Sequence, residues 1–292
     1  MIKKIEGLEN CTELIELDLY DNRVKRIEGL GSLAKLEILD LSFNRIKEVE
    51  NLEPLVSLKK LFLISNRFRK IQNLGCLKTI EMVDFGDNKL RSIEGIEEAE
   101  NATEFYCAKN RITEIHPCIG KLKYLRVLGI QTNDISKISG LEEAENLEEL
   151  YMQQNFITRI EGLENNKKLK ILDLAYNKVQ QIDGLDNNME LTDLWINQNP
   201  IKEWSSVEYL KCLPNLDTIY LIHCQVASDK KYVEWIIENM PQVNQIDSDS
   251  VALIKKRAEM SKKGIKPLDE RNLEEAQKML KSVLKKTDNS DA

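Results

Sequence analysis

Histidine is scarce in this chain, and the motifs of the common enzyme classes are missing. The 292 residues include two histidines, His116 and His223, which lie far apart in the sequence. Neither belongs to a recognisable Ser/His/Asp or Cys/His arrangement, and the chain has no H-E-x-x-H motif and no glycine-rich phosphate loop. We therefore expect no catalytic residues, no metal site and no cofactor.

An excess of basic residues and long apolar runs are also missing. The formal net charge is −7, which argues against nucleic acid as a partner because phosphate binding needs a dominant basic footprint. There is no run of about 18 apolar residues, and residues 1–6 open directly into repeat sequence rather than a signal peptide. We expect a soluble intracellular protein that has no membrane partner.

The cysteines show no paired spacing. None of the six forms a C-x-x-C motif, and two of them, Cys107 and Cys224, occupy positions of a sequence repeat. This usage predicts free thiols in a reducing compartment rather than disulfides or a zinc site. The six are Cys11, Cys76, Cys107, Cys118, Cys212 and Cys224.

A repeated pattern, apolar-x-apolar-x-x-Asn, dominates the sequence. It occurs ten times, and seven of the nine steps between copies are 22 residues. Such a period is typical of a solenoid, in which each unit must stack on its neighbours to bury its apolar side. The middle residues of the ten copies are Asp18, Asp40, Phe62, Asp84, Tyr106, Gly129, Tyr151, Asp173, Trp195 and Tyr220.

One unit, residues 36–46, illustrates the expected fold. Strand residues alternate sides, so Leu39 and Leu41 should point into the core while Ile38, Asp40 and Ser42 face outward. An asparagine at the following bend can satisfy backbone groups of two coils. The short return segments favour 3₁₀ or irregular structure. The fold class is therefore α/β, a curved leucine-rich-repeat solenoid with a parallel β-sheet on its concave face and a C-terminal helical cap.

The expected domain boundaries follow from where the repeat ends. About ten repeats occupy residues 1–226, a cap occupies 227–247, and a charged, partly helical tail occupies 248–292. Ser228 is the expected N-cap of the capping helix, and Val243 and Ile246 should pack beneath it. Two steps between repeats are longer than 22 residues, near residues 116–119 and 204–206, and both insertions should bulge on the return side. We interpret the second as a tolerated loop, with a functional contact as the alternative.

The tail contains two features of its own. A basic cluster precedes Gly264, and an apolar stripe at helical spacing follows Pro267. We interpret the apolar stripe as a solvated helix that packs loosely on the cap, with a dedicated binding helix as the alternative. For the basic cluster, a nuclear-import signal is a further interpretation. The cluster is Lys255, Lys256, Arg257, Lys262 and Lys263, and the stripe is Leu273, Ala276, Leu280 and Leu284.

The outward strand positions combine acidic and aromatic residues. The acids are Glu16, Asp18, Asp40, Asp84, Glu104, Glu149, Asp173 and Asp193, against one base, Lys60. The aromatics are Phe62, Tyr106, Tyr151, Trp195 and Tyr220. Aromatic residues also suit strands for packing reasons, but five in a line beside carboxylates are typical of a protein-binding surface. The concave face should therefore favour a basic patch on a protein partner.

The repeats resemble those of one family, the leucine-rich-repeat regulatory subunit of type-1 protein phosphatase. The similarity includes the Ile-Glu-Gly-Leu unit at residues 160–163, the segments 16–22, 36–44 and 58–63, and Trp204-Ser205; it extends over about residues 1–247. The resemblance implies a eukaryotic, non-catalytic subunit of the nucleus, the cytoplasm or both. Its partner would be the phosphatase catalytic subunit, and a further phosphatase regulator could be a second partner.

The resemblance also implies which residues bind the phosphatase. Each matched position keeps the chemical type of the family residue, with conservative replacements at Asp84, Tyr106 and Asp193. The expected contacts are Asp40, Phe62, Asp84, Tyr106, Asp173, Asp193, Trp195 and Tyr220. The chain differs from the family at its N-terminal end, where an acidic extension and a first repeat are missing, and at Cys224-Gln225, where Asn-Pro is usual.

Two alternatives remain open at this point. The same architecture could serve another protein partner, of the dynein, ciliary or spliceosomal kind. Residues 231–235 also fit a short phosphatase-docking motif, Lys-x-Val-x-Trp, which must be extended to bind. Because this segment is expected to be helical, with Val233 and Trp235 buried, we favour a structural role for it.

Overall fold

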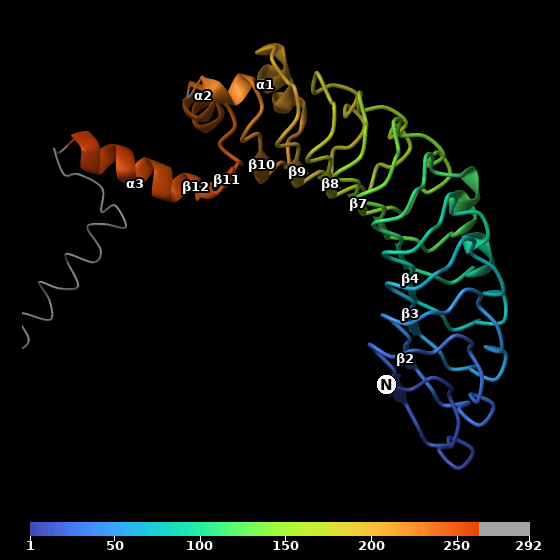
Figure 1. Ribbon diagram of the computed structural model, residues 1–292. Helices are drawn as coiled ribbons and strands as arrows, with labels where there is room; N and C mark the ends of the chain where they lie inside the picture. The colour runs from blue at the N-terminus through green and yellow to red at the C-terminus, as the bar shows by residue number, and fades with distance from the viewer. Residues whose placement is uncertain (230, 263–292) are drawn as a thin grey trace, which may run out of the picture. The chain divides into compact units, whose positions relative to one another are not determined.

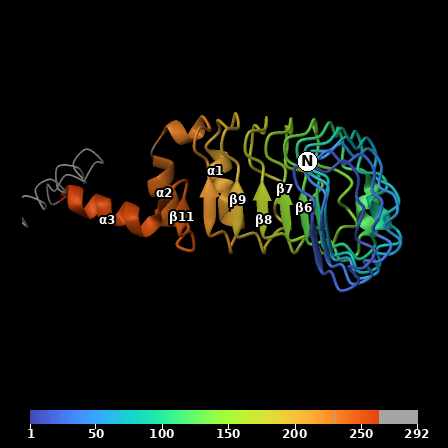
Figure 2. The ribbon, with the colours of Figure 1, turned by 60° about the horizontal axis from the view of Figure 1, so that its bottom comes forward.

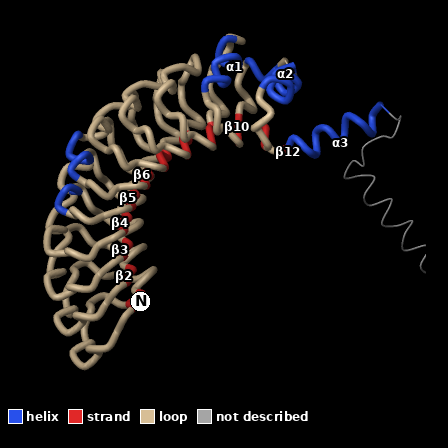
Figure 3. Tube along the Cα trace, turned by 180° about the vertical axis from the view of Figure 1, so that it is seen from behind, coloured by secondary structure: helices blue, strands red, loops and turns tan. Residues whose placement is uncertain are grey.

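The structure is a computed structural model that describes residues 1–229 and 231–262. The chain divides into two compact units, Met1–Asp247 and Ser248–Ala292. The first unit is a curved solenoid whose short strands line the inner side of the curve (Figures 1 and 3). The predicted solenoid with a parallel sheet on its concave face is confirmed.

The strands of the first unit follow one another in sequence order and pair in parallel (Figure 2). They are β1 (Glu16–Asp18), β2 (Ile38–Asp40), β3 (Lys60–Phe62), β4 (Met82–Asp84), β5 (Glu104–Tyr106), β6 (Val127–Gly129), β7 (Glu149–Tyr151), β8 (Ile171–Asp173), β9 (Asp193–Trp195), β10 (Thr218–Tyr220) and β11 (Gln245–Ile246). From β1 to β10, the middle residue of each repeat is the register partner of the next one. The ten middle residues therefore form one continuous line across the sheet.

Alternation within each strand builds the core. Leu39 and Leu41 are fully buried, while Ile38 and Asp40 are partly exposed, as predicted. Ser42, also expected to face outward, is 1% exposed. Tyr20 and Ile222, which occupy the same position in their repeats, are exposed, so the low exposure of Ser42 is not a general property of this position.

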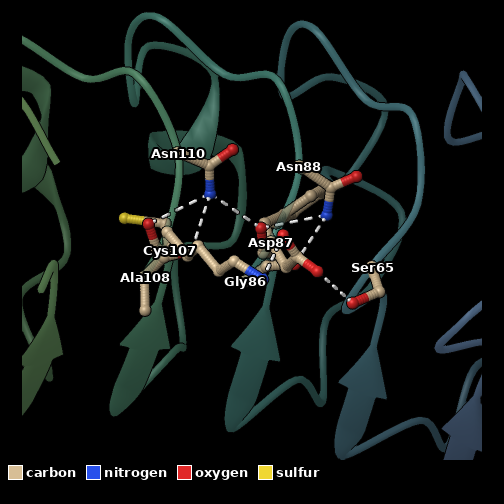
Figure 4. Close-up of polar contacts among 9 residues, drawn as sticks. Ser65, Gly86, Asp87, Asn88, Cys107, Ala108 and Asn110 are labelled. Atoms are coloured by element: carbon tan, nitrogen blue, oxygen red, sulfur yellow. Dashed lines mark hydrogen bonds and ion pairs between the residues drawn. The ribbon is translucent and has the colours of Figure 1, made fainter. Parts of the chain in front are cut away.

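A ladder of buried and partly buried asparagines closes the bend after each of the strands β1 to β9 (Figure 4). The Asn110 side chain donates to the carbonyls of Phe85, Cys107 and Ala108 at 3.0 to 3.1 Å, and its oxygen accepts from Leu90 N at 2.9 Å. One amide thus satisfies backbone groups of both its own coil and the preceding coil. The predicted role of the repeated asparagine is confirmed.

The return side of the solenoid is mostly irregular. Its regular pieces among the described residues are the 3₁₀ helices η1 (Ile96–Glu98), η2 (Pro117–Lys121) and η3 (Leu210–Cys212) and the short helix α1 (Ser205–Tyr209). Both longer repeats place their extra residues here, in η2 and in α1, as predicted. His116 has a structural role at this position, since its Nδ1 accepts a hydrogen bond of 3.2 Å from Cys118 N at the start of η2.

A helical cap covers the last repeat. It contains η4 (Val226–Ser228) and α2 (Lys231–Asn239). Val243 and Ile246 are buried, as predicted. Ser228 is not the N-cap, because it lies within η4; instead, Asp229 Oδ1 accepts a hydrogen bond of 3.0 Å from Lys231 N.

The cap also settles the conformation of the Lys-x-Val-x-Trp segment. Residues 231–235 lie in α2, so they are not in the extended form that docking requires. Val233 and Trp235 are partly rather than fully buried. The Trp235 ring packs edge to face against Trp204, with ring centroids 6.1 Å apart.

The second unit is described as far as residue 262. It contains β12 (Asp249–Ser250) and α3 (Val251–Lys262), and Arg257 forms an ion pair of 2.7 Å with Asp249. Four of the five predicted cluster residues belong to α3, while Lys263 and the apolar stripe at residues 273–284 lie outside the described residues. Within the described residues, no helix has both the length and the apolar character that would cross a membrane.

Candidate functional site

Seven of the eight predicted contact residues lie on the line of middle residues along the concave face. Asp40, Phe62, Asp84 and Tyr106 occupy the consecutive strands β2 to β5. Asp173, Trp195 and Tyr220 occupy β8 to β10. The eighth, Asp193, precedes Trp195 by two residues in β9 and accepts a 2.7 Å hydrogen bond from the Thr192 hydroxyl. Strands β6 and β7 separate the two sets.

The first set contains an aspartate between two aromatic residues. Asp84 has Phe62 and Tyr106 as its register partners on either side, and its Oδ1 accepts a 2.7 Å hydrogen bond from Gly86 N. Burial raises the pKa of Asp84 to about 6, and the nearby Asp40 adds to the increase. We call Phe62, Asp84 and Tyr106 the first cluster.

The second set repeats this arrangement with larger rings. Tyr151 and Trp195 lie two strands apart, a separation of about 9.6 Å, yet their ring centroids are 6.4 Å from each other. The rings therefore lean toward one another across β8, where Asp173 is 4% exposed. Burial raises the pKa of Asp173 to about 6. Tyr220 extends this second cluster, with its ring centroid 6.3 Å from that of Trp195.

The second cluster borders a pocket of about 330 Å³. Asp173, Trp195 and Tyr220 line it together with Ala175 and Asn197. The Trp195 Nε1 is buried and has no hydrogen-bond partner among the residues that the structure describes. Packing against the neighbouring rings therefore holds this indole, rather than a hydrogen bond.

Gly129 and Tyr151 connect the two clusters. A Cβ atom on Gly129 would lie 2.5 Å from Tyr106 Cδ1, so the missing side chain gives the Tyr106 ring its space over β6. The Tyr106 and Tyr151 hydroxyls donate to Glu104 and Glu149 at 2.9 and 2.7 Å. Burial, with help from these carboxylates, raises the pKa of both tyrosines, which keeps their hydroxyls protonated.

The aspartates of the line share a local geometry. In each, Oδ1 accepts a hydrogen bond from the backbone N two residues later, at 2.7 to 2.9 Å, in the manner of an Asx turn. The bond fixes the carboxyl orientation while the second oxygen remains available as an acceptor. The four residues are Asp18, Asp40, Asp84 and Asp173.

The arrangement is suited to binding a protein surface. Asp84 and Asp173 lie four strands apart, about 19 Å, which is too far for one acid–base pair acting at a single bond. Among the described residues, no group of three His, Cys, Asp or Glu side chains could hold a metal ion. What the line presents is charge-assisted acceptors beside aromatic rings.

Sequence reasoning assigned no role to two residues of this site. Tyr151 belongs to the outward aromatic residues and Gly129 to the middle residues, yet neither is among the expected contacts. The period alone places both on the line. That Tyr151 covers Asp173 and that Gly129 makes room for Tyr106 depends on side-chain directions across neighbouring strands.

Comparisons with known proteins agree with this architecture. The family model described as leucine-rich repeats (2 copies) matches residues 12–54 and 145–187. No curated protein matches the sequence. Similar solved structures include the internalin InlF of Listeria monocytogenes, at 21% identity and a TM-score of 0.65, over 85% of this chain and 78% of that one.

Two further solved structures are similar. The functional domain of InlJ from Listeria monocytogenes has 22% identity and a TM-score of 0.65, over 84% of this chain and 50% of that one. The leucine-rich-repeat protein LIC12759 of Leptospira interrogans has 24% identity and a TM-score of 0.72, over 82% of this chain and 62% of that one. The chain thus spans half to about two thirds of these two proteins, and the likeness concerns the fold. With its period, its asparagine ladder and its matching family model, the chain has the leucine-rich-repeat fold.

Proposed function

We propose that this protein is a non-catalytic regulatory subunit that binds the catalytic subunit of type-1 serine/threonine protein phosphatase on its concave face. The binding would control the activity, maturation or targeting of the phosphatase. Leucine-rich repeats provide a scaffold suited to protein binding. The phosphatase itself is proposed from the resemblance of residues 1–247 to that regulatory family.

One observation carries the proposal. Seven of the residues matched to the family's contacts are middle residues of one sheet, and the eighth lies on the same face. Ten strands at about 4.8 Å give this face a length on the order of 45 Å, which is enough for a folded partner. A partner with a basic patch would complement its carboxylates.

The direct test is binding of the purified phosphatase catalytic subunit to variants of the full chain. The combined Phe62→Ala and Trp195→Ala variant removes one aromatic residue from each cluster and should abolish capture in a pull-down. The combined Phe43→Ala and Phe156→Ala variant is the matched control, because both rings are exposed and lie off the line. Unchanged capture by the first variant would reject the proposed face.

Capture from native extract, read by mass spectrometry, tests the identity of the partner separately. Phosphatase catalytic subunit should be enriched by the wild-type chain and lost with the combined aromatic variant. A dynein, tubulin or spliceosomal protein enriched without phosphatase would overturn the proposal in favour of another protein partner on the same scaffold.

Gly129→Ala should weaken phosphatase binding about threefold to tenfold while the repeat fold persists. The new Cβ would lie 2.5 Å from Tyr106 Cδ1, so the Tyr106 ring must move. Because the clash is with a side chain and not with the backbone, the fold can be kept. Titration calorimetry measures the affinity, and circular dichroism checks the fold. Gly31→Ala is the control, because a Cβ there meets no atom within 4 Å. Equal affinity of the two variants would contradict a role for the Tyr106 position.

A further inference from the structure

Basic residues form two columns on the side of the solenoid that follows the carboxyl ends of the strands. The first column comes directly after the repeated asparagine and consists of Arg23, Arg45, Arg67, Lys89 and Arg111. The second column lies two residues further on and consists of Lys25, Lys47, Arg69 and Arg91. We call these nine residues the basic ribbon. All nine are exposed.

Backbone hydrogen bonds between neighbouring coils hold the first column in register. Within the first column, each backbone N from Arg45 to Arg111 donates to a carbonyl of the preceding coil at 2.8 to 2.9 Å. The residue between the two columns is an apolar side chain with no exposed surface in each of the five coils, for example Ile46 or Phe68. The basic side chains on either side of this residue are exposed in each coil. Like charges are therefore stacked coil upon coil.

The leucine-rich-repeat scaffold does not demand cations at these positions. Later repeats make the same backbone bond, as from Asp134 N to Ile112 O at 2.8 Å, but with mixed residues. The first-column positions there are Asp134, Phe156, Lys178 and Pro200. The second-column positions are Ser136, Thr158, Gln180 and Lys202. The ribbon is thus a property of the first five repeats rather than of the fold.

The ribbon charges are not neutralised within the described part of the chain. None of the nine residues forms an ion pair there, although twelve ion pairs occur among the described residues. A hollow of about 550 Å³ crosses the second to fourth coils, and five of its six lining side chains are basic, with Glu48 as the exception. Unpaired, stacked cations around a hollow are an electrostatic cost unless an anionic partner is present.

We propose that the basic ribbon is a second docking surface, which binds an acidic polypeptide segment running across the first five coils. The first column spans four steps of about 4.8 Å, or about 19 Å. An extended peptide rises about 3.3 Å per residue, so a segment of about six residues covers it. Six of the nine ribbon residues are arginines, whose planar guanidinium groups suit bidentate binding of carboxylates.

The charge of the remaining surface favours a short acidic peptide over a nucleic acid. The chain as a whole carries −7 with nine positive charges in the ribbon, so everything outside the ribbon carries −16. A polyanion longer than the ribbon would meet this acidic surface and be repelled. The buried apolar residues between the columns also offer no exposed ring on which bases could stack.

The test is fluorescence anisotropy with a labelled 12-residue peptide of alternating glutamate and serine, at about 50 mM salt. The full-length chain should bind this peptide. The triple variant Arg45→Glu, Arg67→Glu and Lys89→Glu should weaken the binding at least tenfold. The triple variant Arg159→Glu, Lys178→Glu and Lys202→Glu changes the net charge equally on later coils and should stay within twofold of wild type.

Several results would overturn the inference. No binding of the peptide by the wild-type chain would do so, as would equal losses in the two triple variants, which would indicate a general charge effect. Tighter binding of heptauridylate, which carries six phosphates to match the six glutamates, would indicate a nucleic-acid surface instead. Circular dichroism confirms that each variant is folded. None of these readouts involves the phosphatase, so the inference and the proposed function fail separately.

Discussion

Trp195→Ala is expected to weaken binding of the phosphatase catalytic subunit about 30-fold or more, a loss of about 2 kcal/mol. The indole contacts the rings of Tyr151 and Tyr220, covers Asp173 and lines the pocket of the second cluster. Its removal would therefore cost both its own contacts and the arrangement of its neighbours. Titration calorimetry with the purified catalytic subunit measures the loss.

The effect should appear in binding and not in folding. Trp195 is only partly buried, and its neighbour Leu194, which points into the core, is unchanged by the substitution. The thermal midpoint should therefore move little. Phe156→Ala is the matched control, since it removes an exposed ring that is away from the sheet line. A Trp195→Ala chain that binds as tightly as the Phe156→Ala chain would exclude the second cluster from the interface.

The sequence predicts the backbone of this molecule well because the period carries most of the information. A 22-residue repeat with an asparagine at nearly every bend determines which residues pair, so the sequence alone predicts the order of the middle residues from Asp18 to Tyr220. The buried leucines follow from two-residue alternation, as Leu39 and Leu41 illustrate. Even the two longer repeats place their extra residues on the return side.

Side-chain arrangement within the site is less predictable. Asp173 faces the concave side yet is 4% exposed, because two rings from other strands lean over it. The sequence of β8 itself does not predict that the rings of Tyr151 and Trp195 cover Asp173. Likewise, the space above Gly129 is used by Tyr106, which lies 23 residues earlier in the sequence. Such contacts depend on rotamers and on packing between strands, which no periodic pattern specifies.

The helix start in the cap shows a similar limit. Ser228 and Asp229 are both good N-cap residues, and the sequence gives little reason to choose between them. In the structure, Ser228 is the last residue of the 3₁₀ helix η4. Asp229 is then the residue whose side chain meets the first described N–H of α2. Tertiary context, not propensity, decides between the two.

Asp84 and Asp173 should make the stability of the chain depend on pH. Burial raises the pKa of each from 3.8 to about 6 in the folded state, so between about pH 4 and 6 the folded chain binds more protons than the unfolded chain. Their contribution to the free energy of unfolding is fully present below about pH 4 and decreases as pH rises through 6. At neutral pH, both carboxylates are charged in a site that disfavours their charge.

Asp173→Asn should therefore stabilise the free protein at pH 7.5 and weaken its complex with the phosphatase. A neutral amide keeps the hydrogen bond from Ala175 N and avoids burying a charge, with a gain on the order of 1 to 3 kcal/mol at pH 7.5. The gain should vanish near pH 4, where the wild-type carboxyl is protonated. Urea unfolding at several pH values measures it, and the combined Asp84→Asn and Asp173→Asn variant should gain more.

The opposing effect on binding separates a functional carboxylate from a structural one. If the concave face receives a basic partner, loss of both charges should weaken binding at pH 7.5 more than tenfold although the free chain is more stable. Asp18→Asn is the control, because it makes the same bond to the backbone N two residues later but its side chain is exposed. It should show little gain in stability. A double variant that is more stable and binds the phosphatase as tightly as wild type would show that the two carboxylates do not serve this partner.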